Sequence, residues 1–252
     1  MISLENITFS YGKEPFLKVD SAVLEDGCLT AILGENGSGK TTLLKLINGI
    51  EKPRGGDITV DGKKLFSLSE RERARLISYF PQSRPIPDMT AFETVLLGRY
   101  PYGFRASRED EAAAHRCLAE SGAEELASRN MMTLSYGERQ RVYLAMLKAQ
   151  NTRNCIFDEP SSYMDASAAF GLMDSLKAYC KEGRCVVCVL HDVTLAMSYA
   201  DKIMIMKKGR VTDMGTPCEI YERRSIETAF GIRLERIISG GKEIYLPLPK
   251  EK

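Results

Sequence analysis

The chain has 252 residues, of which 44% are hydrophobic and 27% are charged, and its formal net charge is +1. A chain of this length and composition can bury the core of one large α/β domain or of two smaller ones. The near-zero charge provides no field that would draw the chain to nucleic acid or to a lipid surface, so composition predicts neither partner.

In chain order, the first sixty residues contain three segments of alternating character, which predict an added antiparallel sheet: "ISLENITFS", "FLKVDSAVLE" and "DITVDG". Short apolar runs predict buried strands at 28–34, 155–160, 184–191 and 202–209. Helical patterns follow the first three of these runs, near 40–49, 166–181 and 193–200. This alternation favours an α/β fold with a mostly parallel sheet covered by helices on both faces.

The pattern changes to helices alone between about residues 85 and 150. The segments are "AFETVLLGRY", "SREDEAAAHRCLAESG" and "YGERQRVYLAMLKAQ". We interpret this stretch as a helical subdomain inserted into the α/β core, so that residues 1–252 form a single domain. The sequence contains no internal repeat, low-complexity tract or Pro/Gly-rich linker that would suggest a second one.

The seven cysteines are scattered without framework spacing, which is typical of reduced thiols in a cytosolic compartment. Cys185 and Cys188 lie three residues apart in an apolar run, and this spacing on a strand points side chains to opposite faces. We therefore expect buried thiols rather than metal ligands. No apolar run approaches the roughly 20 residues that span a bilayer, and the chain opens on a strand-like segment instead of a signal peptide. If this protein acts at a membrane, another polypeptide chain must anchor it there.

The strongest chemical signal is "GENGSGKTT" at 34–42, which follows a predicted strand and opens a predicted helix. Its glycines, Gly34, Gly37 and Gly39, allow successive backbone N–H groups to turn towards phosphate oxygens at a helix N-terminus. Lys40 would reach the β- and γ-phosphates, and the hydroxyl of Thr41 would ligate Mg²⁺. A glycine-rich turn of this kind can be purely structural, but motif and context together predict nucleotide binding.

A second strand, in "CIFDEP", ends in two carboxylates. Asp158 is expected at the strand end, where it would hold Mg²⁺ directly or through water. Glu159 points elsewhere and would polarise an attacking water. An Asp-Glu pair before proline is by itself an ordinary solvated turn. The phosphate-binding loop (P-loop) at 34–42 makes the catalytic interpretation preferable.

With these motifs, the chain resembles the ATP-binding-cassette (ABC) ATPases over essentially its whole length. "TFSYGKEPFL" resembles the segment whose aromatic residue, here Tyr11, stacks on adenine, and "ISYFPQ" resembles the strand before the Q-loop glutamine, Gln82. "LSYGERQRV" resembles the family signature, and "DEPSSYMD" resembles Walker B followed by the D-loop, ending at Asp165. "CVLHD" resembles the switch segment, with His191 at the end of a strand. Five such segments in the family's order make the resemblance specific.

The resemblance implies an ATPase that uses ATP and Mg²⁺, with a P-loop core, an antiparallel β subdomain and an inserted helical subdomain. It implies catalytic roles for Glu159, His191 and Gln82. Mg²⁺ would be held by Thr41, Gln82 and Asp158. The implied nucleotide contacts come from Tyr11, Gly34, Asn36, Gly37, Ser38, Gly39, Lys40, Thr41, Thr42, Ser135, Gly137 and Asp165.

In the family, the signature of one subunit closes on ATP held by the P-loop of another. Ser135 and the backbone N–H of Gly137 would then face the γ-phosphate across a head-to-tail homodimer. The segments 90–102 and 215–237 resemble ATPases of iron-siderophore, haem and cobalamin importers. This branch implies a peripheral subunit on the cytoplasmic face of the membrane, docked under integral-membrane permease subunits. An extracytoplasmic substrate-binding protein would feed them, and the helical insertion and the segment after Gln82 would receive the permease.

Other functions stay open. A P-loop small-molecule kinase would not need the "LSYGE" and "CVLHD" segments, and an ABC protein of translation or DNA repair usually carries two cassettes, a long coiled coil or a basic arm. A cassette of another transport system, or a regulatory cassette without transport, is the alternative. "YLAMLKAQ" and Tyr136, where glycine is usual, depart from the family's pattern.

Tyr136 has two readings. We expect its ring to turn away from the phosphate, whereas the alternative is that it plugs the dimer seam and slows the enzyme. A left-handed backbone at this position would cost roughly 1–2 kcal/mol for a residue with a Cβ. Arg139 and Arg141 are expected on a helix surface, paired with carboxylates, and His115 is expected on a helix surface without a catalytic role.

Overall fold

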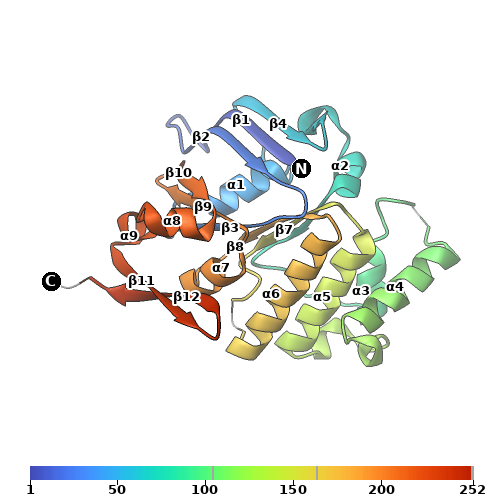
Figure 1. The fold of residues 1–252 in the computed structure, drawn as a ribbon. Coiled ribbons are helices and arrows are strands. Elements are labelled where there is room, and N and C mark those ends of the chain that lie inside the picture. The colour runs from blue at the N-terminus through green and yellow to red at the C-terminus, as the bar shows by residue number, and fades with distance from the viewer. Residues whose placement is uncertain (104, 163, 251–252) are drawn as a thin grey trace.

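The computed structural model describes residues 1–103, 105–162 and 164–250, and most of the described strands belong to one sheet of ten (Figure 1). Its order is β5 (Lys63–Lys64), β4 (Gly55–Val60), β1 (Ile2–Phe9), β2 (Leu17–Leu24), β10 (Arg210–Gly215), β9 (Lys202–Lys207), β3 (Leu29–Gly34), β8 (Cys185–Val189), β7 (Asn154–Asp158) and β6 (Ile77–Phe80). The last five strands pair in parallel, which confirms the predicted mostly parallel sheet.

Strands β1, β2 and β4 form the expected antiparallel part, in which β1 pairs with both β2 and β4. They do not form a detached layer. Strand β10, which sequence analysis did not predict, pairs antiparallel with β9 and meets β2 at Arg210 and Lys18. The antiparallel part is therefore a continuation of the parallel core.

Helices cover both faces of the parallel strands because successive side chains of each strand point to opposite sides. Leu29, Ala31 and Leu33 of β3 join one buried cluster, whereas Ile32 joins the other. The described α-helices are α1 (Lys40–Ile47), α2 (Glu70–Leu76), α3 (Ala91–Leu97), α4 (Arg108–Glu120), α5 (Tyr136–Gln150), α6 (Ala166–Lys181), α7 (Val193–Tyr199), α8 (Pro217–Glu222) and α9 (Ser225–Phe230). Short 3₁₀ turns occur at Leu65–Ser67, Glu124–Leu126 and Met131–Thr133.

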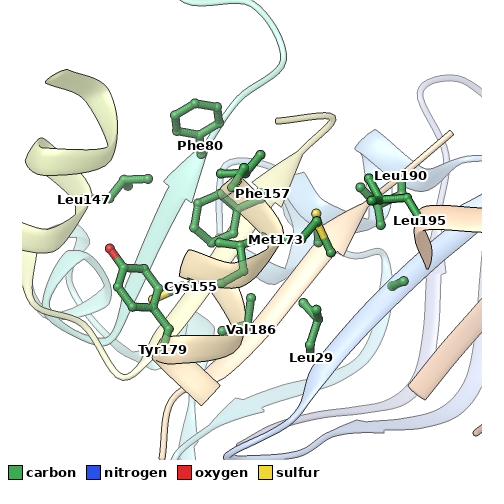
Figure 2. Close-up of a cluster of buried hydrophobic side chains, with 14 of the residues drawn as sticks. Leu29, Phe80, Leu147, Cys155, Phe157, Met173, Tyr179, Val186, Leu190 and Leu195 are labelled. Atoms are coloured by element: carbon green, nitrogen blue, oxygen red, sulfur yellow. The ribbon is translucent and has the colours of Figure 1, made fainter. Parts of the chain in front are cut away.

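Helices α3, α4 and α5 lie between β6 and β7 in the chain and contact one another, as the purely helical pattern predicts. Figure 1 shows α5 and α6 side by side, with α3 and α4 beyond α5. The larger buried cluster runs from these helices to the sheet without a break (Figure 2), and Phe80 and Phe157 meet in it with ring centroids 5.7 Å apart. The helical segment is thus packed directly on the strands that carry the candidate site.

The thiols of β8 follow the strand period. Cys188 belongs to the cluster under α5 and α6, and Cys185 belongs to the cluster on the other face. Both are fully buried and free, and burial raises the pKa of each. The prediction of buried thiols on opposite faces is confirmed.

The C-terminal residues form a hairpin, β11 (Ile232–Ser239) and β12 (Lys242–Pro249), that sequence analysis did not predict. The turn is Gly240–Gly241, and both glycines have a positive φ, which suits a two-residue hairpin loop. Leu234 and Tyr245 bury one face of the hairpin, and β12 contacts α7. Among the described residues, no helix is both long and apolar enough to cross a membrane.

Candidate functional site

The turn between β3 and α1 forms a cradle of backbone groups. Gly37 and Gly39 have φ values of 78° and 102°, a region that residues with a Cβ rarely adopt. A Cβ at Gly34 would lie 2.4 Å from the carbonyl oxygen of Met206 and 2.5 Å from Ser38 Oγ. Gly39 is the N-cap of α1 and offers no side-chain cap, so the first N–H groups of the helix are left for another acceptor. This arrangement suits phosphate oxygens.

Lys40 lies inside this cradle, although lysine is rarely buried. Its Nζ donates to the carbonyl oxygens of Gly34 at 2.7 Å and Glu35 at 3.1 Å, and only 5% of the residue is exposed. Burial lowers the pKa of Lys40, while Glu159 and Asp158 oppose this shift. Ser38 Oγ is also buried, without a hydrogen-bond partner in the described part of the chain. A buried cation and an orphaned hydroxyl are the groups that an anionic ligand would satisfy.

Asp158 ends β7 as predicted, and it is 1% exposed. Thr41 Oγ1 donates to its Oδ1 at 3.4 Å, and Tyr79 Oη donates to its Oδ2 at 3.3 Å. Burial raises the pKa of Asp158, and these two hydrogen bonds oppose the shift. The described residues contain no group of three or more His, Cys, Asp or Glu side chains that could hold a metal. One carboxylate and one hydroxyl suit Mg²⁺, which usually takes its other ligands from phosphate and water.

Glu159 follows with an unusual backbone, since its φ is 51°. Its Oε2 accepts a hydrogen bond from Gln82 Nε2 at 2.6 Å and a longer one from Ser162 Oγ at 3.3 Å. Its Oε1 pairs with His191 Nε2. A non-glycine residue in this region costs free energy, and such strain is concentrated at functional sites. The side chain of Gln82 contacts Glu159 in this structure. The expected contact of Gln82 with Mg²⁺ stays a prediction.

Lys40, Thr41 and Glu159 meet with Gln82 and His191 in one cleft of about 630 Å³, whereas the predicted residues Gly34, Ser38 and Asp158 do not line it. Its lining consists of Phe16, Asn36, Gly37, Gly39, Lys40, Thr41, Thr42, Gln82, Glu159 and His191. All of them except Phe16 were predicted from the sequence. Phe16 lies in "TFSYGKEPFL", where the resemblance assigns the aromatic role to Tyr11, and it also begins a predicted strand, so it was not predicted as a site residue.

Tyr11, the expected adenine-stacking residue, lies beside this cleft and does not line it. Its ring packs edge-on against Phe9 at a centroid distance of 4.8 Å and lies 5.5 Å from that of Phe16. Its hydroxyl is 3.0 Å from Thr42 Oγ1, and 60% of the residue is exposed. An exposed ring next to the phosphate cradle is available for stacking, which stays a prediction.

The signature residues lie elsewhere. Helix α5 begins at Tyr136, and Ser135 caps it by accepting from the backbone N–H of Glu138 at 3.3 Å. Asp165 caps α6 by accepting from the backbone N–H of Ala168 at 2.8 Å. Ser135, Gly137 and Asp165 line a second, more apolar cavity of about 760 Å³ between α5 and α6. This cavity shares no lining residue with the P-loop cleft, so the fold does not bring these three predicted contacts to the P-loop of their own chain.

Tyr136 has a helical backbone and no positive φ, so the left-handed strain considered for it does not arise. Its ring is directed to its own chain, where Oη donates to the carbonyl oxygen of Ser162 at 2.9 Å. Arg141 pairs with Glu125 at 3.8 Å, as expected for a helix-surface residue. His115 is exposed on α4 and stacks on Phe92.

The family model described as "ABC transporter" matches residues 17–162. The ferric enterobactin transport ATP-binding protein of Escherichia coli is 35% identical over 91% of this chain and 86% of its own length. A probable siderophore transport system ATP-binding protein of Bacillus subtilis is 34% identical over 93% and 87%. The hemin import ATP-binding protein of Myxococcus xanthus is 34% identical over 90% and 88%.

Solved structures give the same picture of the fold. A metal-chelate type ABC transporter in an inward-facing conformation matches 99% of this chain and 98% of that chain, with a TM-score of 0.84 and 25% identity. A dimeric ATP-binding cassette bound to ADP and phosphate matches 86% of this chain and 99% of that chain, with a TM-score of 0.76 and 29% identity.

Proposed function

Because this chain belongs to the ABC transporter family of ATP-binding proteins, we propose that it is the ATP-hydrolysing subunit of an importer for a metal chelate. The chelate class is iron-siderophore, haem or cobalamin, as in the names of its relatives. Residues 1–252 would act as one ABC ATPase domain, with a helical subdomain at approximately 85–150. The observation that carries the proposal is Glu159, held between Gln82 and His191 over the cleft that contains Lys40.

In this proposal the P-loop holds the triphosphate. Backbone N–H groups from Gly37 to Thr41 and the ammonium of Lys40 bind the phosphate oxygens, and Ser38 supplies a further hydroxyl. Thr41, Gln82 and Asp158 would hold Mg²⁺, which would neutralise charge on the phosphates. Tyr11 stacks on the base.

Glu159 polarises the water that attacks the γ-phosphate. It is the general base, because its carboxylate is already oriented by donors on both oxygens. Gln82 and His191 orient Glu159 and the water, and His191 contacts the γ-phosphate. The bond from the γ-phosphorus to the bridging oxygen breaks as the water oxygen bonds to phosphorus, which yields ADP and phosphate.

Ser135, Gly137 and Asp165 act in trans. Their cavity is separate from the P-loop cleft of the same chain, so a second copy is needed to bring them to ATP. Two chains arranged head to tail would sandwich two ATP molecules, and each helix α5 would direct its N-terminus at the partner's γ-phosphate. The dimeric cassette among the similar structures supports this arrangement.

The partners are two integral-membrane permease subunits, which would hold the dimer on the cytoplasmic face of the membrane. An extracytoplasmic substrate-binding protein would deliver the chelate, and nucleic acid has no part in the cycle. ATP binding closes the dimer and drives the permease, and hydrolysis reopens it.

Two experiments test this function. Affinity purification of the chain from detergent-solubilised membranes should co-purify permease subunits. Uptake of ferric siderophores, haem and cobalamin should be measured in cells that carry the wild-type chain or Lys40→Ala. Loss of uptake for one chelate class with Lys40→Ala identifies the substrate class, whereas unchanged uptake of all three contradicts the proposal.

A further inference from the structure

Tyr136 ties the signature helix to the loop that follows Glu159 within one chain. Its Oη donates to the carbonyl oxygen of Ser162 at 2.9 Å and accepts from Gln140 Nε2 at 2.9 Å. Gln140 Nε2 also lies 3.4 Å from the carbonyl oxygen of Pro160. Tyr136 and Gln140 are one turn apart on α5, so both side chains face the same loop. The glycine usual at position 136 could not make either bond of the hydroxyl.

The same amide is held from its other side by Arg84, which follows Gln82. Arg84 Nη2 donates to Gln140 Oε1 at 3.0 Å, and Gln140 is only 3% exposed. The guanidinium carbon lies 3.5 Å from the centroid of the Phe80 ring and 4.8 Å from that of Tyr143. These contacts fix the donor direction from Arg84 through Gln140 to Tyr136.

This series of hydrogen bonds begins near Gln82 and ends at Ser162, and both of these residues contact Glu159. Gln82, two residues before Arg84, donates to Glu159 Oε2, and Ser162 Oγ donates to the same oxygen. The contacts therefore close a circuit that runs from Glu159 through the Q-loop, the signature helix and the loop 160–162. Apart from Arg84 Nη1, which is buried without a hydrogen-bond partner in the described part of the chain, the polar atoms named here are paired, and networks of paired groups stiffen the residues they join.

From this circuit we propose that Tyr136 is a positioning residue for Glu159. By closing the circuit, its hydroxyl holds the loop 160–162, and with it the strained backbone of Glu159, in the orientation that polarises water. The inference rests on the proposed role of Glu159 as general base. Tyr136 lies between Ser135 and Gly137, which we place against the partner's ATP, but its hydroxyl bonds to Ser162 of its own chain and does not line the P-loop cleft. Removal of the hydroxyl alone should therefore fall on the chemical step and leave nucleotide binding unchanged.

The test is steady-state ATP hydrolysis by the purified chain with Mg²⁺. Tyr136→Phe keeps the ring and removes the hydroxyl, and we expect kcat to fall about three- to tenfold with an unchanged KM for ATP. Tyr102→Phe is the matched control, because its Oη also donates to a backbone carbonyl, that of Gln150, at the other end of α5. The control should hydrolyse ATP at the wild-type rate, and thermal unfolding should show that both variants fold.

A double-mutant cycle completes the test. If Tyr136 and Gln140 act in one circuit, Tyr136→Phe combined with Gln140→Leu should slow hydrolysis no more than the worse single variant. Should Gln140→Leu fail to fold, Arg84→Lys takes its place. Unchanged kcat in Tyr136→Phe, a rise in KM alone, or multiplying effects in the cycle each overturn the inference while leaving the proposed function intact. Absence of hydrolysis by the wild-type chain would instead overturn the proposed function, and this inference with it.

Discussion

Gln82 donates a hydrogen bond of 2.6 Å to the carboxylate of Glu159, although 77 residues separate the two in the chain. They follow β6 and β7, which are parallel neighbours, so their loops emerge at the same edge of the sheet. Ligand sites of parallel sheets form at this edge. The bond thus connects the start of the helical segment directly to the candidate base.

We expect Glu159→Gln to lose hydrolysis by a factor of about 100 or more, since a general base contributes roughly 10²–10⁴-fold. The variant should still bind ATP with Mg²⁺, and light scattering should show that ATP converts it from monomer to dimer. Lys40→Ala should instead lose nucleotide affinity. Normal turnover in Glu159→Gln would remove the proposed base, and a monomer that ignores ATP would contradict the sandwich.

Asp158→Asn should stabilise the nucleotide-free protein while it abolishes Mg²⁺-dependent hydrolysis. The pKa of Asp158 is raised by burial above its ordinary value of 3.8, so its charge destabilises the folded state at neutral pH. Removing this penalty should therefore raise Tm.

Because the pKa of Asp158 is raised in the folded state, the effect of Asp158→Asn on Tm should depend on pH. The gain in Tm should be full above the raised pKa of Asp158 and should vanish as the pH falls towards 3.8, where wild-type Asp158 is itself protonated. Calorimetry of both proteins from pH 7 to pH 4 measures it. A lower Tm for Asp158→Asn at pH 7 would show that the carboxylate's hydrogen bonds outweigh its burial.

Gly137 allows the trans contact to be tested separately from folding. A Cβ at Gly137 would meet no atom within 4 Å, and its φ is not positive. Gly137→Ala should therefore fold and gain up to about 1 kcal/mol of helix stability. Gly137→Asp should fold as well but lose hydrolysis, because its carboxylate would face the partner's phosphate. Wild-type hydrolysis by Gly137→Asp would place the signature away from the nucleotide.

Tyr11 is expected to stack on the base, and its hydroxyl contact with Thr42 is expected to be secondary. Tyr11→Ala should weaken ATP and GTP binding alike, by roughly 1–3 kcal/mol, because stacking discriminates little between purines. Tyr11→Phe should be nearly neutral in the same titration. If the Phe variant binds as poorly as the Ala variant, the bond to Thr42 carries the effect and stacking does not.

The structure also shows why some elements escaped sequence analysis. Helix α2 has no buried residue, so it has no apolar period to detect, and the capping box of Ser69 and Glu72 was its only signal. Strands β10 and β12 follow tight turns after β9 and β11, and the Gly240–Gly241 dipeptide was a local hairpin signal that sequence analysis did not use. Of the pairings of these three strands, only that of Arg210 in β10 with Lys18 in β2 joins segments far apart in the chain, and no local pattern encodes it.

The sequence by itself determined the phosphate cradle, the buried strands and the opposite-facing thiols, because each depends on residues close together in the chain. Strand period, glycine freedom and helix start are local properties. The tertiary structure alone decided the environment of Glu159 and the direction of Tyr136. It also decided the separation of Ser135 and Asp165 from the P-loop cleft. These depend on which loops the parallel sheet brings to one edge, and that follows from the packing of the whole chain.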